Sequence, residues 1–83
     1  MKEYNMDGEL VNSIVNEMYD SNENMCGISE IVEGCCGEKY YNNYGKEELD
    51  YVKEVMEEFC RIYVEFDEEN EVMSIVGEVD DSE

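Results

Sequence analysis

The stretch KEELDYVKEVMEEFCRIYVEFDEENEVMSIVGEV, residues 46–79, decides the fold class, because its hydrophobic period changes partway along. From Lys46 the apolar residues recur in alternating steps of three and four, which is typical of one face of an amphipathic helix. This apolar stripe consists of Leu49, Val52, Met56, Phe59 and Tyr63, widened by Val55 and Cys60. The opposite face carries the acidic side chains Glu47, Glu48, Asp50, Glu54, Glu57 and Glu58. Lys46 is spaced to pair with Asp50 one turn later, and Lys53 is spaced likewise to pair with Glu57.

Between Cys60 and Tyr63 the pattern changes to a period of two, which is typical of a half-buried strand. Ile62, Val64 and Phe66 alternate with more polar neighbours. The acidic tract 67–71 then separates this run from a second segment rich in β-branched residues, Val72 to Val79, in which Met73, Ile75 and Val79 share one side. We therefore predict a long helix followed by a β-hairpin that turns through the acidic tract.

The N-terminal half of the chain predicts two shorter helices. Apolar residues recur there as adjacent pairs every four positions, with Asp7 placed to cap the helix and the polar run 20–24 placed to end it. These paired residues are Leu10, Val11, Ile14, Val15, Met18 and Tyr19. A short second helix begins near Asn24 or Ser29, and Gly34 and Gly37 are expected at its end. Residues 39–45 (KYYNNYG) then read as an aromatic-rich loop.

The predicted architecture is α+β: one domain over residues 1–83, with three helices packed against a small antiparallel hairpin and with residues 1–6 and 80–83 frayed. The chain carries no N-terminal segment typical of a signal peptide and no apolar run of membrane-spanning length. We therefore expect a cytoplasmic protein without a membrane partner. If a phage encodes it, the cytoplasm in question is that of the infected host cell.

The charge of the chain is extreme: 24 acidic residues, 5 basic residues, no histidine and a net charge of −19. Such a charge repels nucleic acids and anionic membranes, attracts basic surfaces and accelerates encounter with them. The composition therefore indicates a basic protein as partner and excludes direct nucleic-acid binding.

Two acidic clusters are the candidate partner-binding surface. Fifteen of the 24 carboxylates lie from Glu47 onward, and helix residues three or four apart lie about 6 Å apart on one face. This spacing is comparable with that of phosphates along a nucleic-acid strand. The candidate residues are Glu47, Asp50, Glu54, Glu57, Glu58, Asp67, Glu68, Glu69 and Glu71. The alternative is that these side chains form an ordinary solvent-exposed helix face and bind no partner.

Tyr40, Tyr41 and Tyr44 crowd the predicted loop. Tyrosine offers rigid contact area with a polar tip and is frequent at binding hot spots, so Tyr41 and Tyr44 are candidate aromatic anchors for the partner. The alternative is that these rings cover the core of a small domain. We expect one or two of them to pack inward and at least one to remain exposed.

Metal binding and catalysis are weakly indicated. The four cysteines, Cys26, Cys35, Cys36 and Cys60, contain no Cys-x-x-Cys pair and read as small apolar residues of the core. A calcium loop starting at Asp20 fails where Met25 replaces the required glycine and Ile31 the required glutamate. Without histidine, a phosphate-binding glycine loop or a distinct carboxylate pair, we predict no catalytic site, metal or cofactor.

In size, charge and α+β composition, the whole chain resembles the small acidic phage-encoded inhibitors: anti-CRISPR proteins, anti-restriction proteins and inhibitors of uracil-DNA glycosylase. No diagnostic motif carries the resemblance. It implies tight, stoichiometric blocking of a basic DNA- or RNA-binding site, often on a CRISPR effector complex, and so evasion of a host defence nuclease. An acidic adaptor or regulatory subunit that does not mimic nucleic acid is the alternative, and the sequence leaves monomer and dimer both open.

Overall fold

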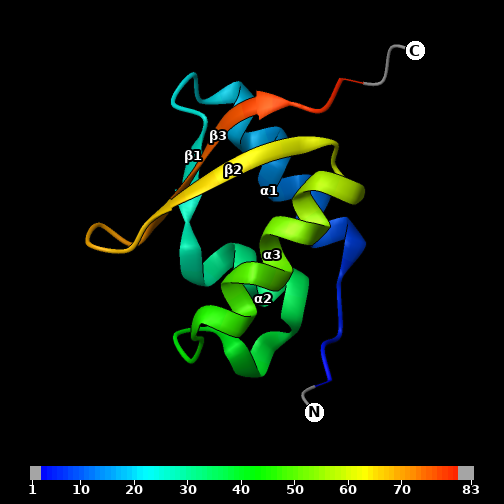
Figure 1. Ribbon diagram of the computed structural model, residues 1–83, viewed down its shortest axis with the longest axis vertical. Helices are drawn as coiled ribbons and strands as arrows, with labels where there is room; N and C mark the ends of the chain where they lie inside the picture. The colour runs from blue at the N-terminus through cyan, green and yellow to red at the C-terminus, as the bar shows by residue number, and fades with distance from the viewer. Residues whose placement is uncertain (1–2, 81–83) are drawn as a thin grey trace.

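The computed structural model describes residues 3–80, which fold into an α+β domain as predicted (Figure 1). A three-stranded antiparallel sheet lies against three α-helices, and the turn between the last two strands extends away from the helices. In chain order the elements are α1 (Gly8–Asp20), β1 (Met25–Gly27), α2 (Ile28–Cys36), the 3₁₀ turn η1 (Glu38–Tyr40), α3 (Lys46–Glu58), β2 (Ile62–Asp67) and β3 (Val72–Glu78). None of these helices is long and apolar enough to cross a membrane.

The sheet has one strand more than the predicted hairpin. Strands β2 and β3 form that hairpin, and β1 pairs with the other edge of β3, so the order is β1-β3-β2. Strand β1 aligns Met25 with Ser74 and Gly27 with Val72. Strand β1 was not predicted, because three residues ending in glycine are too short to show a period of two.

Helix α1 forms as predicted. The Asp7 carboxylate accepts a hydrogen bond from the Leu10 N–H at 3.2 Å, which satisfies one of the free donors at the helix start. Val11 and Met18 are fully buried on its inner face, whereas Tyr19 at its last turn is exposed.

Helix α2 begins at Ile28, next to Ser29, one of its two predicted starts; the other, Asn24, was wrong because β1 occupies Met25–Gly27. One of the two expected terminators of α2 lies inside it. Gly34 is buried in the helix, where a Cβ atom would stand only 3.1 Å from Val11 Cγ2 of α1. The glycine therefore permits close helix packing and does not end the helix. Gly37, with a φ of +125°, provides the end.

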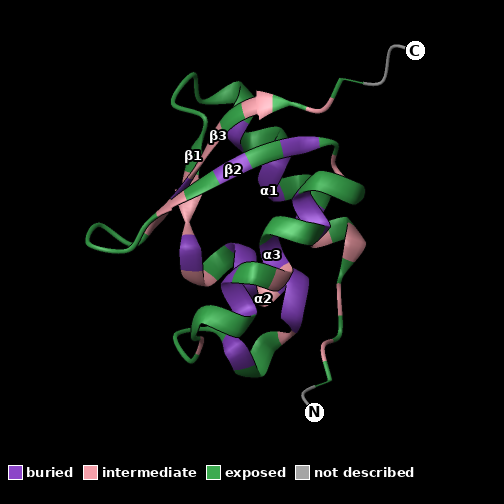
Figure 2. Cartoon of the chain, viewed as in Figure 1, coloured by how far each residue is buried: buried purple, intermediate pink, exposed green. Residues whose placement is uncertain are grey.

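Helix α3 is shorter than predicted, and the end of its apolar stripe was wrong. The helix ends at Glu58, and Arg61 adopts a left-handed φ of +59° that turns the chain into β2. Phe59, predicted as core, is 47% exposed; Tyr63, which the sequence placed both at the end of the helical stripe and on the outer side of the strand, is 44% exposed. Leu49, Val52, Val55 and Met56 are buried as predicted, and Figure 2 shows this inner side purple beneath a green outer side.

From residue 3 the segment before α1 lies against the rest of the domain, and the fraying of residues 1–6 stays a prediction. The Asn5 N–H donates to the Cys36 carbonyl at 2.8 Å, and the Asp7 N–H donates to the Gly34 carbonyl at 2.7 Å. The Tyr4 ring packs against Tyr51 and Tyr40, with ring centroids 4.6 and 5.3 Å away. Residues 1–2 and 81–83 lie outside the described residues.

Glu48, which was predicted to lie on the solvent-exposed face of α3, is completely buried. Its Oε1 accepts the Gly45 N–H at 2.7 Å, and its Oε2 accepts the Tyr4 hydroxyl at 2.8 Å. The position near the start of α3 also favours a negative charge, because the helix N-terminus carries partial positive charge. Glu48 therefore joins the N-terminal segment to α3 from inside the domain.

We predict that Glu48→Ala lowers the free energy of unfolding by about 2–3 kcal/mol, because the Tyr4 hydroxyl and the Gly45 N–H lose their acceptor beside a new cavity. Tyr4→Phe, which removes one donor only, should cost about 1 kcal/mol. Urea denaturation followed by circular dichroism measures both. Glu57→Ala, at an exposed site on the same helix, should change stability by less than about 0.5 kcal/mol; equal losses at positions 48 and 57 would contradict the role assigned to Glu48.

Candidate partner-binding surface

The acidic side of α3 forms a regular row opposite the buried side. At about 100° per residue, Glu47, Asp50 and Glu54 fall within a narrow arc, and Glu57 and Glu58 extend it by another turn. All five are exposed. Because the rise is about 1.5 Å per residue, the row spans about 16 Å along the helix axis. We call these five residues the α3 acidic row.

The second cluster lies in the β2–β3 turn, where Asp67, Glu68, Glu69 and Glu71 are all exposed. Asp67 accepts hydrogen bonds from the Asn70 side-chain amide at 2.7 Å and from the Asn70 N–H at 3.2 Å. These bonds lower the pKa of the Asp67 carboxyl and so favour its charged form. The turn therefore presents ordered negative charge.

The two clusters meet across a hollow of about 520 Å³ between α3 and the hairpin. Asp50 lines it from α3, and Glu65 and Glu68 line it from the hairpin. Two lysines lie there as well: Lys46 Nζ is 4.0 Å from the Asp50 carboxylate, the predicted pair, and Lys53 Nζ is 5.9 Å from the centroid of the Phe66 ring. The lysines offset part of the negative charge at this junction, so the unmatched charge lies towards the C-terminal half of the α3 acidic row and towards the tip of the turn.

The three loop tyrosines divide as predicted. Tyr40 is 7% exposed, and Tyr44 packs partly buried against the core, whereas Tyr41 is 46% exposed. Of the two candidate anchors, Tyr41 therefore has the greater area free for contact. Sequence reasoning missed other exposed apolar side chains, because it counted several of them as core; they are Tyr19, Met25, Phe59, Tyr63 and Val76.

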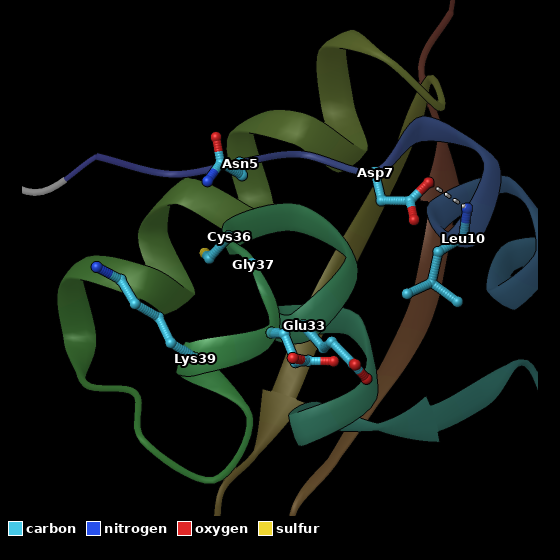
Figure 3. Close-up of a pocket in the computed structure, with 8 residues that line it drawn as sticks. Asn5, Asp7, Leu10, Glu33, Cys36, Gly37 and Lys39 are labelled. Atoms are coloured by element: carbon cyan, nitrogen blue, oxygen red, sulfur yellow. Dashed lines mark hydrogen bonds between the residues drawn. The ribbon is translucent and has the colours of Figure 1, made fainter.

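A hollow of about 480 Å³ lies between the segment before α1 and the end of α2 (Figure 3). Its polar side chains include Asn5, Glu33 and Lys39, and the Asp7 carboxylate there points to the Leu10 N–H that it caps. The neighbouring Cys36 is buried. This hollow combines a helix cap with scattered polar groups.

The cysteines are free thiols in or near the core. Cys35 and Cys36 are buried, and Cys26 and Cys60 are half-buried. Burial raises the pKa of Cys26 to about 12 and raises the pKa values of Cys35 and Cys60, so these three side chains stay protonated and poorly nucleophilic at neutral pH. Within residues 3–80, no three Cys, Asp or Glu side chains gather in a way that could hold a metal ion.

Nearly all of the acidic side chains face solvent. Of the 22 acidic residues within residues 3–80, 20 are exposed, and only Glu33 and Glu48 are not. Their mutual repulsion opposes compaction, and dissolved salt screens it.

We therefore predict that the melting temperature rises by about 5 °C or more, roughly 1 kcal/mol, between about 0.01 M and 1 M NaCl, over which the Debye length falls from about 30 Å to 3 Å. Scanning calorimetry measures the shift. A variant with Glu57, Glu65 and Glu69 all changed to Gln should melt higher in low salt and show a smaller shift. A melting temperature independent of salt in both proteins would mean that repulsion does not limit stability.

Comparisons of the chain with protein-family models, with curated proteins and with solved structures find no match.

Proposed function

We propose that this protein is a stoichiometric inhibitor that mimics nucleic acid and blocks the basic DNA- or RNA-binding site of a host defence nuclease, and that within this class it is an anti-CRISPR protein acting on a CRISPR effector complex. The observation that carries the proposal is the α3 acidic row, with its five exposed carboxylates opposite the buried face of one helix. The class-level resemblance of the sequence supports the same conclusion.

The physical argument starts from what a nucleic-acid-binding groove requires. Such a groove gains much of its affinity when its Lys and Arg side chains replace the counterions condensed around regularly spaced phosphates. The α3 acidic row offers carboxylates one helical turn or less apart, and the β2–β3 turn adds four more. Because the buried side of α3 is part of the core, the backbone that carries these charges is held in place before binding, which reduces the entropic cost of association.

An adaptor or regulatory subunit without mimicry is the second candidate. It is favoured by the exposed apolar side chains outside the α3 acidic row, among which Tyr41, Tyr63 and Val76 are each more than 40% exposed. An adaptor that binds through such residues depends weakly on salt, whereas a mimic loses affinity steeply as salt rises. The salt dependence of binding therefore separates the two candidates.

The experiment first captures partners of the tagged protein from a lysate that contains a CRISPR effector, with and without competing DNA. The captured nuclease is then assayed for DNA cleavage against increasing inhibitor. We expect DNA to displace the nuclease and the wild-type protein to stop cleavage at a ratio near one to one.

The row is tested with the variant Glu54→Lys, Glu57→Lys and Glu58→Lys, which we predict to weaken inhibition at least about a hundredfold, since three attractive contacts become repulsive. The matched control is Glu17→Lys, Asp20→Lys and Glu23→Lys, which changes net charge equally at exposed sites in and after α1 and should retain inhibition within about fivefold. Circular dichroism verifies that both variants fold. A folded row variant that inhibits as well as the control would overturn the proposed mechanism.

A further inference from the structure

The second flank of α3 carries a hollow of about 310 Å³, which we call the Phe59 hollow. It is lined by Met6, Tyr51, Glu54, Val55, Glu58 and Phe59. Four of these six side chains are apolar or aromatic, and two are acidic members of the α3 acidic row. The hollow therefore lies directly beside the surface that we propose for partner binding.

Packing between distant segments forms the apolar part of this hollow. Val55 is buried, and Met6 and Tyr51 are half-buried against the core. At the far end, Phe59 leaves the helix and lies against the start of α1, where a Cβ on Gly8 would stand 3.4 Å from the tip of its ring and 3.9 Å from the methyl group of Met6. These contacts shape the hollow before any partner binds, although Phe59 remains 47% exposed.

The acidic part is the pair Glu54 and Glu58, which lie one turn apart on the same face of α3 and are exposed. Neither takes part in an ion pair within residues 3–80. On the opposite flank, the hollow between α3 and the hairpin contains Lys46 and Lys53 among its carboxylates. Unlike the hollow between α3 and the hairpin, the Phe59 hollow has no basic residue in the lining that the described residues form.

We propose that the Phe59 hollow binds one arginine side chain of a protein partner, with the guanidinium between Glu54 and Glu58 and the side chain against Phe59. This inference rests on the proposed function in one respect: it takes the partner to be a basic protein.

The chemistry selects arginine over other occupants. The aliphatic part of an arginine side chain covers apolar surface while its charged end reaches the carboxylates. The planar guanidinium donates hydrogen bonds in two directions and stacks on an aromatic ring, whereas the lysine ammonium is a compact, strongly hydrated charge. A purely apolar occupant would leave two glutamates beside it without a counter-charge, and a second copy of this chain would bring another net charge of −19.

The test is a titration of the isotope-labelled protein with nona-arginine and with nona-lysine, two peptides of equal charge, followed by amide and methyl NMR shifts at about 0.15 M NaCl, where the Debye length is about 8 Å. We expect the largest shifts from nona-arginine at residues 54–59 and at the Met6 methyl group. We expect nona-lysine to bind at least about threefold more weakly. Shifts centred elsewhere, or equal affinity for the two peptides, would overturn the inference.

Two pairs of variants separate local from overall charge. Glu54→Gln with Glu58→Gln should weaken nona-arginine binding about tenfold. Glu17→Gln with Glu23→Gln, which removes the same charge at exposed positions outside the hollow and outside both acidic clusters, should weaken it no more than about twofold. Phe59→Leu keeps an apolar side chain but removes the ring, and it should reduce the preference for arginine over lysine while Phe59→Tyr preserves it. Equal effects of the two charge pairs would contradict the site.

The peptide titration involves no nuclease, so its outcome is independent of the inhibition assay. If the hollow binds arginine but no nuclease is inhibited, the proposed function fails and the site stands. If a captured nuclease is inhibited but nona-arginine gives no shifts centred on residues 54–59 and binds no more tightly than nona-lysine, the site fails and the proposed function stands.

Discussion

Electrostatic repulsion opposes folding of this chain, because 24 acidic residues share 83 positions with 5 basic ones. The fold meets this constraint by segregation: the buried core of residues 3–80 is aliphatic and aromatic, with Glu48 as its one buried acidic member. Glu48 can be buried because its carboxylate is compensated inside the protein. Glu48 lies at the start of α3 and accepts two hydrogen bonds, one from the Gly45 N–H and one from the Tyr4 hydroxyl, so the buried carboxylate has partners that solvent would otherwise supply. Repulsion is thus confined to the surface, where water and salt weaken it.

Helix α3 links the confinement of charge to the surface with the proposed binding of a partner. Its inner side, from Leu49 to Met56, contacts α2 and β2 and so holds the two halves of the domain together. Its outer side carries the acidic row. Because one helix supplies both, the spacing of the carboxylates is set by backbone hydrogen bonds and core packing. A flexible acidic tail of the same charge would lose far more conformational entropy on entering a basic groove.

The sequence predicted those features that depend on a sustained period. The stripes of α1 and α3 and the alternation of β2 and β3 each repeat several times, so their type and their main buried residues emerged correctly. Features that depend on a single contact could not be predicted from the sequence. Strand β1 is three residues long, the role of Gly34 depends on the approach of Val11, and the burial of Glu48 depends on Tyr4, which lies 44 residues away in sequence. Phe59 and Tyr63 continued the helical period in sequence, but the helix ends at Glu58 and the positive φ of Arg61 turns the chain into β2, where that period no longer applies. The candidate acidic residues are all exposed, whereas the Phe59 hollow, built from segments 45 residues or more apart, had no sequence signal.

The distribution of the basic residues explains why the two flanks of the acidic row differ. Lys46 and Lys53 follow the helical period on the hairpin side, where they offset Asp50, Glu65 and Glu68. On the other flank the lining of the hollow provides Tyr51 and Phe59 but no cation. Regular negative charge attracts any basic surface, and therefore contributes affinity and association rate more than selectivity. The arginine site proposed for the Phe59 hollow would add selectivity, because a side chain with an apolar stem and a planar cationic end matches both its apolar and its acidic lining. Under the proposed function, this asymmetry of α3 would give a uniformly acidic protein a means of distinguishing among basic partners.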